Sequence, residues 1–278
     1  MQALADQTIL VTGATDGLGQ AIATELAAAG ARVVLHGGDD RKGQQALREI
    51  QRHTGNSNLF WHCADLTSLT EAAELAARIS QACGQLDTLV NNAGVGLITP
   101  GGGQRMVSQD GYELRFAVNY LAPYVLTRKL EPLLRRSAPA RVVNVTSAGQ
   151  EPIDFGDVML ERGYDDTRAY QQSKLALIMF TFDLAAELAG TGVTVNCLHP
   201  ASYRPAKPGK GHPEPRSSLT DGVRATMRLI VSPALENVTG RYYDGLLEGQ
   251  AIDQAYSQDA RQRLHRMSDQ LTGLASEN

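Results

Sequence analysis

The chain has 278 residues, a net charge of −4 and 42% hydrophobic residues. This composition is close to that of an average globular protein, and it excludes a collagen-like, an intrinsically disordered or a disulfide-stapled chain. The small negative charge gives no electrostatic reason to bind nucleic acid or an anionic membrane. No run of about 18 apolar residues occurs, and the N-terminus lacks the basic and apolar regions of a signal peptide. We therefore expect a cytoplasmic protein with no nucleic-acid and no membrane partner.

Short apolar runs alternate with helical patterns along the chain, beginning with Thr8-Ile9-Leu10-Val11. Strands are predicted at 8–11, 32–36, 58–62, 87–91, 141–145 and 193–198. Helices are predicted at 18–29, 40–53, 66–82, 112–136, 165–189, 219–231 and 253–271. Strands rich in β-branched residues and joined by helices are typical of a parallel sheet covered on both faces. Because crossovers are right-handed, the predicted fold class is α/β with a single doubly wound parallel sheet, the Rossmann fold.

The sequence between these predicted elements indicates how many domains the chain has. No linker separates two cores and no internal repeat occurs, so we expect a single domain over residues 1–278. All nine tyrosines lie after position 111. This asymmetry predicts a cofactor half at about 1–110 and a catalytic and substrate half at about 111–278. The proline-rich segment 200–217 is predicted to be a mobile loop before the C-terminal helices.

Three scattered cysteines, Cys63, Cys83 and Cys197, indicate a reducing compartment. Their spacing does not match that of a metal site, and small buried hydrophobic residues are the favoured interpretation. We therefore expect no bound metal.

A glycine-rich segment, Thr12 to Gly19 (TGATDGLG), follows the first predicted strand and opens the first predicted helix. Glycines at such a turn let the backbone approach a pyrophosphate, which binds free N–H groups at the positive end of the helix. An ordinary strand–helix turn is the alternative, but the place in the first βαβ unit favours a dinucleotide. The candidate contacts are Gly13, Thr15, Asp16, Gly17, Leu18 and Gly19.

Tyr170 and Lys174 are four positions apart on a predicted helix and therefore share one face. A free tyrosine has a pKa near 10, and a lysine cation nearby is expected to lower that pKa by favouring the phenolate. A chance pair on a solvated helix is the alternative interpretation. Together with Ser147 at a strand end and the glycine-rich loop, the pair predicts an acid/base site.

The joint pattern resembles the short-chain dehydrogenase/reductase family. The matching motifs are TGxxxGxG at 12–19, Asp65-Leu66, the NNAG segment 91–94, Asn119, Ser147, and YxxxK from Tyr170 to Lys174. The resemblance implies that Tyr170 is the general acid/base, that Ser147 hydrogen-bonds the substrate oxygen, and that Lys174 tunes Tyr170 and holds the nicotinamide ribose. Asn119 is expected either to support a water in a proton relay or to bond within a helix kink.

The same resemblance implies a nicotinamide dinucleotide cofactor. Further expected contacts, besides the glycine-rich loop, Tyr170 and Lys174, are His36, Asp65, Leu66, Asn92, Ala93, Gly94, Pro200 and Ser202. Gly37 stands where NAD-preferring members usually carry an acid, so NADP(H) is favoured and NAD(H) is the alternative. His36, Arg41 and Lys42 could supply positive potential for a phosphate, while Asp39 and Asp40 oppose it.

Ser147 and Tyr170 are 23 positions apart, a wide spacing that resembles the branch with retinol dehydrogenases and protochlorophyllide reductases. The implied activity is hydride transfer between the cofactor and a small-molecule carbonyl or secondary alcohol. Reduction of an activated C=C bond and a non-catalytic NAD(P)-sensing role are the alternatives. Sugar-nucleotide epimerases normally have the spacing TGxxGxxG, which does not occur here. The acids of the insert 150–168 are interpreted as a solvated face.

Three further features of the sequence allow more than one interpretation. Basic residues in the loop after Pro200, including Arg204 and Lys207, are either solvated or form a lid over an acidic ligand. Tyr242 and Tyr243 either pack the C-terminal helix on the sheet or line a pocket. Family resemblance implies a homodimer or homotetramer formed through the helix that carries YxxxK, whose apolar residues include Leu175, Leu177, Ile178, Met179, Phe180 and Phe182.

Overall fold

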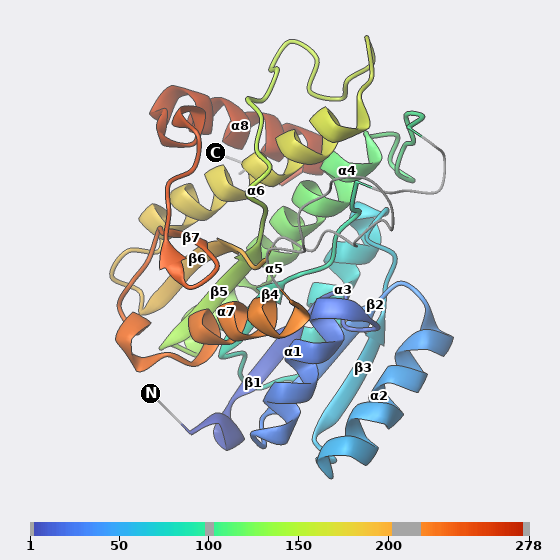
Figure 1. Cartoon of the computed structure of the whole chain (residues 1–278), viewed down its shortest axis with the longest axis vertical. Helices are drawn as coiled ribbons and strands as arrows, with labels where there is room; N and C mark the ends of the chain where they lie inside the picture. The colour runs from blue at the N-terminus through green and yellow to red at the C-terminus, as the bar shows by residue number, and fades with distance from the viewer. Residues whose placement is uncertain (1–2, 98–102, 202–217, 275–278) are drawn as a thin grey trace, which may run out of the picture.

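One eight-stranded sheet runs through the molecule in the computed structural model, which describes residues 3–97, 103–201 and 218–274 (Figure 1). The strands are β1 Thr8–Val11, β2 Arg32–Gly37, β3 Leu59–Cys63, β4 Thr88–Asn91, β5 Ala140–Val145, β6 Val193–His199, β7 Tyr242–Asp244 and β8 Leu247–Glu248. Their order is β3-β2-β1-β4-β5-β6-β7-β8, and every pair is parallel except β7 with β8. The order reverses between β1 and β4, where an open α/β sheet forms its binding crevice.

Helices cover both faces of this sheet (Figure 1). They are α1 Gly17–Ala28, α2 Asp40–Thr54, α3 Leu69–Ala82, α4 Leu114–Phe116, α5 Ala122–Arg136, α6 Asp166–Glu187, α7 Leu219–Val231 and α8 Gln258–Thr272. One apolar core lies between the sheet and α3, α5 and α6, and a second lies between the sheet and α1 and α7. The predicted doubly wound fold class is therefore confirmed.

The elements differ from the sequence-based expectation in three places. The strands β7 and β8 were not expected, and Tyr242 and Tyr243 are core residues that face the two different cores. The stretch 112–136 is α4, a π-helical turn at Ala117–Leu121 and then α5. The stretch 253–271 is a 3₁₀ turn, Asp253–Tyr256, followed by α8, whose first turn is capped by the Ser257 hydroxyl accepting from the Ala260 N–H. Three-residue strands and single-turn helices carry too little periodicity to be read from sequence.

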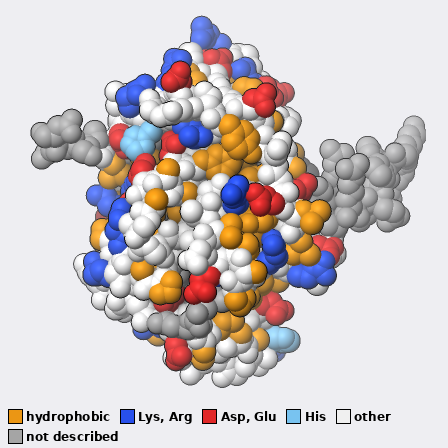
Figure 2. Space-filling view, turned by 90° about the vertical axis from the view of Figure 1, so that its left-hand side faces the viewer, with side chains coloured by type: hydrophobic (Ala, Val, Ile, Leu, Met, Phe, Trp, Pro, Cys, Tyr) orange, Lys and Arg blue, Asp and Glu red, His pale blue; other side chains and the backbone are white. Residues whose placement is uncertain are grey.

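Basic and acidic side chains alternate on the face of the molecule in Figure 2, and hydrophobic side chains form small groups between them. This mixture agrees with the small net charge of the chain. Among the described residues, no helix has both the length and the apolar character needed to cross a membrane.

Candidate active site

The loop after β1 is joined to the segment after β4 by a set of short hydrogen bonds. The Thr12 hydroxyl accepts from the N–H groups of Asn92 and Ala93, each at 3.0 Å. The Asn92 amide Nδ2 donates to the carbonyl oxygens of Thr12 at 2.9 Å and Gly13 at 3.2 Å. The structure therefore brings the glycine-rich loop and the NNAG segment together at the switch point of the sheet.

Close approach of these two segments requires glycine at two positions. A Cβ atom on Gly13 would lie 2.8 Å from the Ala93 Cα. A Cβ atom on Gly19 would lie 2.1 Å from the Gly13 carbonyl oxygen and 2.5 Å from the Asn92 Nδ2. Since both obstacles include backbone or a fixed amide, side chains at these positions would open the loop.

The N-terminal end of α1 is suited to an anion. Within the described part of the chain, the Asp16 side chain accepts no capping hydrogen bond, and the first turn of α1 carries no acid. The first N–H groups of the helix and its positive dipole end thus face the glycine-rich loop. Leu18 is partly buried and packs against the second core. These features fit the pyrophosphate of a dinucleotide.

The structure corrects the expectation that His36 adds positive potential at the end of β2. The His36 ring is 1% exposed, and its Nε2 is 3.1 Å from the Ala64 carbonyl oxygen. Burial lowers the pKa of His36 to about 4. The side chain is therefore uncharged at neutral pH and offers no cation to a phosphate.

Trp61, on the neighbouring strand β3, packs beside the end of β2. A Cβ atom on Gly37 would lie 2.7 Å from the Thr15 methyl and 3.0 Å from the Trp61 ring. The Trp61 Nε1 donates to the Asp40 carboxylate at 2.7 Å. The Asp39 carboxylate accepts from the Lys42 N–H at 2.9 Å and caps α2. Asp40 thus binds the Trp61 indole and Asp39 caps α2, so both acids that were expected to oppose a phosphate stabilise the local fold. No pattern in the sequence indicated that Trp61 packs at this position.

Asp65 and Leu66 lie beyond the end of β3, as expected. The Asp65 carboxylate accepts from the Thr67 N–H at 2.9 Å and from the Gln109 Nε2 at 2.9 Å. Leu66 is 7% exposed and belongs to the first core. Leu66 can therefore meet a ligand through its backbone, and the Asp65 side chain shares its oxygens with the surrounding loop.

The three residues expected at the catalytic centre converge from β5 and α6. Ser147 follows β5, and its side chain lies near enough to the Tyr170 phenol to favour a lower phenol pKa. The Lys174 Nζ lies 5.8 Å from the centre of the Tyr170 ring and donates to the Val145 carbonyl oxygen at 3.0 Å. The four-residue spacing on α6 thus places phenol and amine on one side of the helix, as the sequence predicts.

The pKa of Tyr170 differs from the expectation. Burial raises the pKa of Tyr170 above its ordinary value, and the nearby Ser147 side chain opposes this only in part. Burial also lowers the pKa of Lys174 to about 8. The prediction of a lowered phenol pKa is therefore wrong for this structure, because removal from water outweighs the favourable neighbours.

Asn119 lies in the π-helical turn Ala117–Leu121. Its Nδ2 donates to the Val95 carbonyl oxygen at 3.1 Å and to the Ser173 hydroxyl at 2.9 Å. Its Oδ1 accepts from the Val95 N–H at 2.6 Å. This side chain ties the segment after Gly94 to α6. Of the two expected roles, the geometry favours bonding at the helix irregularity.

Two polar side chains that sequence reasoning missed bind the backbone of Ser147. The Tyr242 phenol donates to the Ser147 carbonyl oxygen at 3.3 Å, and the Gln150 Nε2 donates to the same oxygen at 3.2 Å. Tyr242 is 95 positions from Ser147, so no local pattern could have indicated the contact. At the end of β6, Pro200 is buried. Ser202 and the basic residues of segment 204–216 lie outside the described residues.

The acids of the insert 150–168 mostly hold local turns. Asp165 caps α6 by accepting from the Arg168 N–H at 2.7 Å, and Asp157 accepts from the N–H groups of Glu161 and Arg162. Asp154 pairs with the Arg168 guanidinium at 3.4 Å. These contacts agree with the interpretation of the acids as a solvated, structural face.

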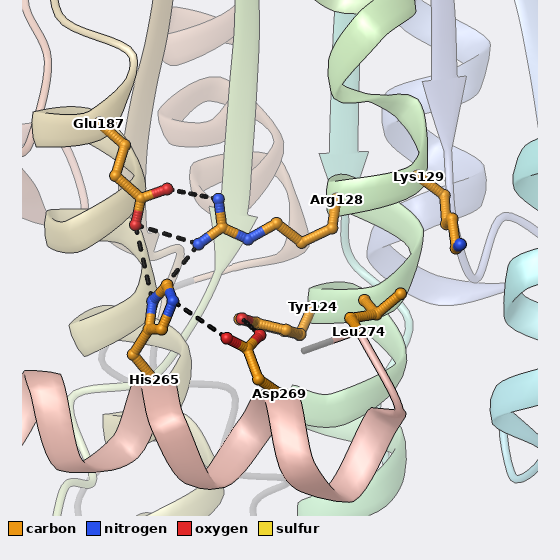
Figure 3. A pocket seen from close by; sticks show the side chains of 7 residues that line it. All are labelled: Tyr124, Arg128, Lys129, Glu187, His265, Asp269 and Leu274. Carbon is orange, nitrogen blue, oxygen red and sulfur yellow. Dashed lines mark hydrogen bonds and ion pairs between the residues drawn. The ribbon is translucent and has the colours of Figure 1, made fainter. Parts of the chain in front are cut away.

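A separate polar cavity of about 360 Å³ lies between α5, α6 and α8 (Figure 3). Arg128 donates to Glu187, and the His265 Nε2 is 3.3 Å from the Asp269 carboxylate. The Tyr124 phenol donates to the other Asp269 oxygen at 2.5 Å. This cluster ties α8 to the two helices beneath it.

The apolar residues expected at a dimer contact belong to the core of this chain instead. Each of the following is at most 3% exposed: Leu175, Leu177, Ile178, Met179 and Phe180. Phe182 stacks on Tyr256 with 5.3 Å between ring centres, and α8 packs against α6. These side chains stabilise the fold and are enclosed by the chain's own helices.

Known proteins with similar sequences belong to the family that these motifs indicate. The family model described as short chain dehydrogenase matches residues 7–207. Retinol dehydrogenase 13 of Mus musculus is 36% identical over 289 residues, which cover 97% of this chain and 84% of the relative. Retinol dehydrogenase 14 of Homo sapiens is 33% identical over 296 residues, covering 96% of this chain and 87% of the relative.

Two solved structures with similar folds point to the same family. A putative uncharacterized protein from Mycobacterium paratuberculosis superposes with a TM-score of 0.80 at 27% identity, covering 98% of this chain and 96% of that one. A putative short chain dehydrogenase from Shigella flexneri, complexed with NADP, has a TM-score of 0.69 at 28% identity and covers 88% of this chain and 99% of its own. The chain is therefore an enzyme of the short-chain dehydrogenase/reductase family and belongs to its retinol dehydrogenase-like branch.

Proposed function

We propose that this oxidoreductase uses NADP(H) to interconvert a small-molecule carbonyl and its alcohol, with Tyr170 as the general acid/base. The observation that carries the proposal is the convergence of buried Ser147 and Lys174 on the half-buried Tyr170, whose ring centre lies 5.8 Å from the Lys174 Nζ. A phenol of raised pKa keeps its proton at neutral pH, which suits a proton donor in carbonyl reduction.

Each residue then has a defined task. The bound nicotinamide supplies or accepts the hydride. Ser147 donates a hydrogen bond to the substrate oxygen and orients it beside Tyr170. Tyr170 gives that oxygen a proton in reduction and takes one in oxidation. Lys174, when charged, stabilises the phenolate and binds the ribose.

The preference for NADP(H) is supported by the end of β2. An acid in place of Gly37, the usual ligand of the NAD ribose, would bring its Cβ to 2.7 Å from the Thr15 methyl and 3.0 Å from the Trp61 ring, so a neighbouring side chain would have to move. The neighbour from Shigella flexneri was crystallised with NADP. Residues Gly13, Gly19, Asn92, Ala93 and Gly94 would hold the cofactor at the switch point.

The names of the relatives direct the choice of substrate. Retinol dehydrogenases 13 and 14 match nearly the whole chain, so we propose all-trans-retinal as the first carbonyl to test. A panel of ketones, aldehydes, quinones and enones separates carbonyl reduction from C=C reduction. A single domain, a cytoplasmic location and a homo-oligomer remain predictions of the sequence.

The decisive experiment compares the wild type with Tyr170→Phe, using NADPH and NADH in separate assays. We expect Tyr170→Phe to abolish turnover while NADPH binding, followed by fluorescence titration, stays within about threefold. We expect kcat/KM to be higher with NADPH than with NADH. Near-wild-type turnover in the variant would disprove the catalytic assignment, and a strong preference for NADH would disprove the cofactor assignment. Binding of NADPH without turnover on any panel member would support the sensing alternative.

A further inference from the structure

Arg115 is a buried cation to which the sequence motifs assign no role. It is 1% exposed and has the largest volume among the fully buried side chains of the described residues. Burial of a charge costs several kcal/mol unless partners surround it. A buried arginine is therefore expected where its hydrogen bonds hold segments of the chain in positions that apolar packing alone would not determine.

One side of the Arg115 guanidinium binds the segment that continues from the NNAG motif. Its Nε donates to the Gly96 carbonyl oxygen at 3.2 Å, and its Nη2 donates to the Leu97 carbonyl oxygen at 3.3 Å. The preceding residue, Val95, is held by both polar atoms of the Asn119 side chain. Residues 95–97 are therefore fastened at every carbonyl.

The other side of the guanidinium binds the approach to α6. Its Nη1 donates to the Tyr164 phenol at 2.7 Å, and its Nη2 is 3.9 Å from the Asp166 carboxylate at the start of α6. The Tyr164 phenol donates in turn to Glu113 at 3.1 Å. Burial and the Glu113 carboxylate raise the pKa of Tyr164 to about 12, so the phenol keeps the proton it donates.

Glu113 anchors the cluster to the helix beneath. It is 1% exposed, its Oε1 is 3.9 Å from the Arg115 Nη1, and its Oε2 accepts from the Phe116 N–H at 2.7 Å. The positive charge of Arg115 is thus faced by two carboxylates, Glu113 and Asp166. Only a planar guanidinium has enough donors in fixed directions to reach two carbonyls and a phenol together.

We propose that Arg115 is a positioning residue that sets the distance between the cofactor-side segment 94–97 and the first turn of α6. Tyr170 lies one turn after Asp166 on that helix, and Gly94 lies beside Asn119 and Lys174. Arg115 thereby places the Tyr170 phenol relative to the nicotinamide, a consequence that rests on the proposed function. Tyr164 belongs to the insert 150–168, so the insert helps to hold Arg115 in place.

The test compares Arg115→Lys with Arg141→Lys. Arg141 is a matched control, because it is also buried and donates to two carbonyl oxygens, of Leu229 at 2.8 Å and Ser232 at 2.9 Å. It lies near the start of β5, at the opposite end of the sheet from Ser147. Tyr164→Phe is the second variant, because it removes one oxygen and keeps the ring.

Three quantities are measured for each protein: hydrogen–deuterium exchange of the segments 94–97 and 164–170, the dissociation constant of NADPH, and kcat and KM for all-trans-retinal. We expect Arg115→Lys to speed exchange in both segments and to lower kcat by about tenfold or more, with NADPH affinity changed by less than about threefold. Tyr164→Phe should change the same quantities in the same direction by less. Arg141→Lys should lower Tm and leave exchange in both segments and kcat unchanged.

The proposal is overturned if Arg115→Lys leaves exchange in the two segments at the wild-type rate, or if Arg141→Lys lowers kcat as much. Exchange and NADPH affinity need no substrate. A chain that turns over none of the tested carbonyls therefore disproves the proposed function and still decides whether Arg115 holds the two segments.

Discussion

At the scale of single residues, burial decides the protonation of the groups around the site. The Lys174 amine is 6% exposed, and the pKa of about 8 leaves it mostly charged at pH 7 and mostly neutral at pH 9. The Tyr170 phenol stays protonated over this range because its pKa is raised. The two groups therefore change charge in different pH ranges, with the amine first.

We expect this order to appear in the pH dependence of kcat/KM, which reports the free enzyme. For reduction with NADPH, kcat/KM should be constant below pH 7 and fall as Lys174 loses its proton around pH 8. For oxidation of the alcohol, kcat/KM should rise with pH because Tyr170 must accept a proton, and the loss of the Lys174 charge should limit this rise above about pH 8. Steady-state assays in both directions from pH 6 to 10 measure this. A reduction profile that is flat to pH 10 would show that the charge of Lys174 is not needed.

The titration of His36 makes the stability of the folded chain depend on pH. Its pKa is about 4 in the folded chain and 6.5 as the ordinary value, so the unfolded chain binds the proton more tightly. The contribution of His36 to stability is complete above pH 6.5 and is lost as the pH falls toward 4, by about 3 kcal/mol.

The variant His36→Gln, which keeps an N–H donor but does not titrate, should lose less stability over this range. Urea unfolding of both proteins at pH 7 and pH 4.5 measures the difference. Equal losses in the two proteins would assign the acid sensitivity to other groups.

At the scale of elements, the site depends on the close approach of the loop after β1 and the segment after β4, which only glycine allows at positions 13 and 19. A Cβ added to Gly19, in the first turn of α1, would overlap the Gly13 carbonyl oxygen and the Asn92 amide, which also bonds the loop. A change in α1 therefore reaches the segment after β4 directly.

We expect Gly19→Ala to separate the two segments and to weaken NADPH binding by about a hundredfold, since a few tenths of an ångström will not relieve the overlap. Gly84→Ala is the control, because a Cβ there meets nothing within 4 Å. Isothermal titration with NADPH compares the two variants with the wild type. Unchanged affinity in Gly19→Ala would mean that the loop can open without loss.

The sequence predicts the parallel strands well, because buried β-branched runs are a local signal. The same holds for the glycine-rich loop and for Tyr170 with Lys174, whose spacing alone puts them on one face of α6. Trp61, Arg115 and Tyr242 could not be predicted, since each acts through contacts with chain segments far away in sequence. The raised pKa of Tyr170 was missed because enclosure depends on the whole fold.

At the scale of the whole molecule, α8 closes the chain over α5 and α6 through polar contacts. Only Leu264 and Ser268 of this helix are buried. The Arg261 guanidinium donates to Asp183 of α6 at 2.7 Å, and the Tyr112 phenol donates to the Leu271 carbonyl oxygen at 2.8 Å. The C-terminal helix is therefore attached by these polar contacts in addition to the apolar packing of Leu264, Met267 and Leu271 on the first core.

We expect Arg261→Asp to place two carboxylates together and to loosen α8, with a loss of about 1–3 kcal/mol in the free energy of unfolding. Adding Asp183→Arg should restore part of that loss by exchanging the charges. Hydrogen–deuterium exchange of residues 258–272 and thermal unfolding at low and high salt measure both proteins. If the double variant is no more stable than Arg261→Asp alone, the pair does not hold α8.

Trp61 is the only tryptophan of the chain, and its ring lies against Gly37 at the end of β2 and Gly43 in α2. Its indole emission overlaps the absorption of a reduced nicotinamide, so a bound NADPH would quench it by energy transfer. The chain thus carries an intrinsic optical reporter beside the end of β2 and the glycine-rich loop residue Thr15. Stopped-flow recording of Trp61 emission would follow the arrival and departure of the cofactor without any attached dye.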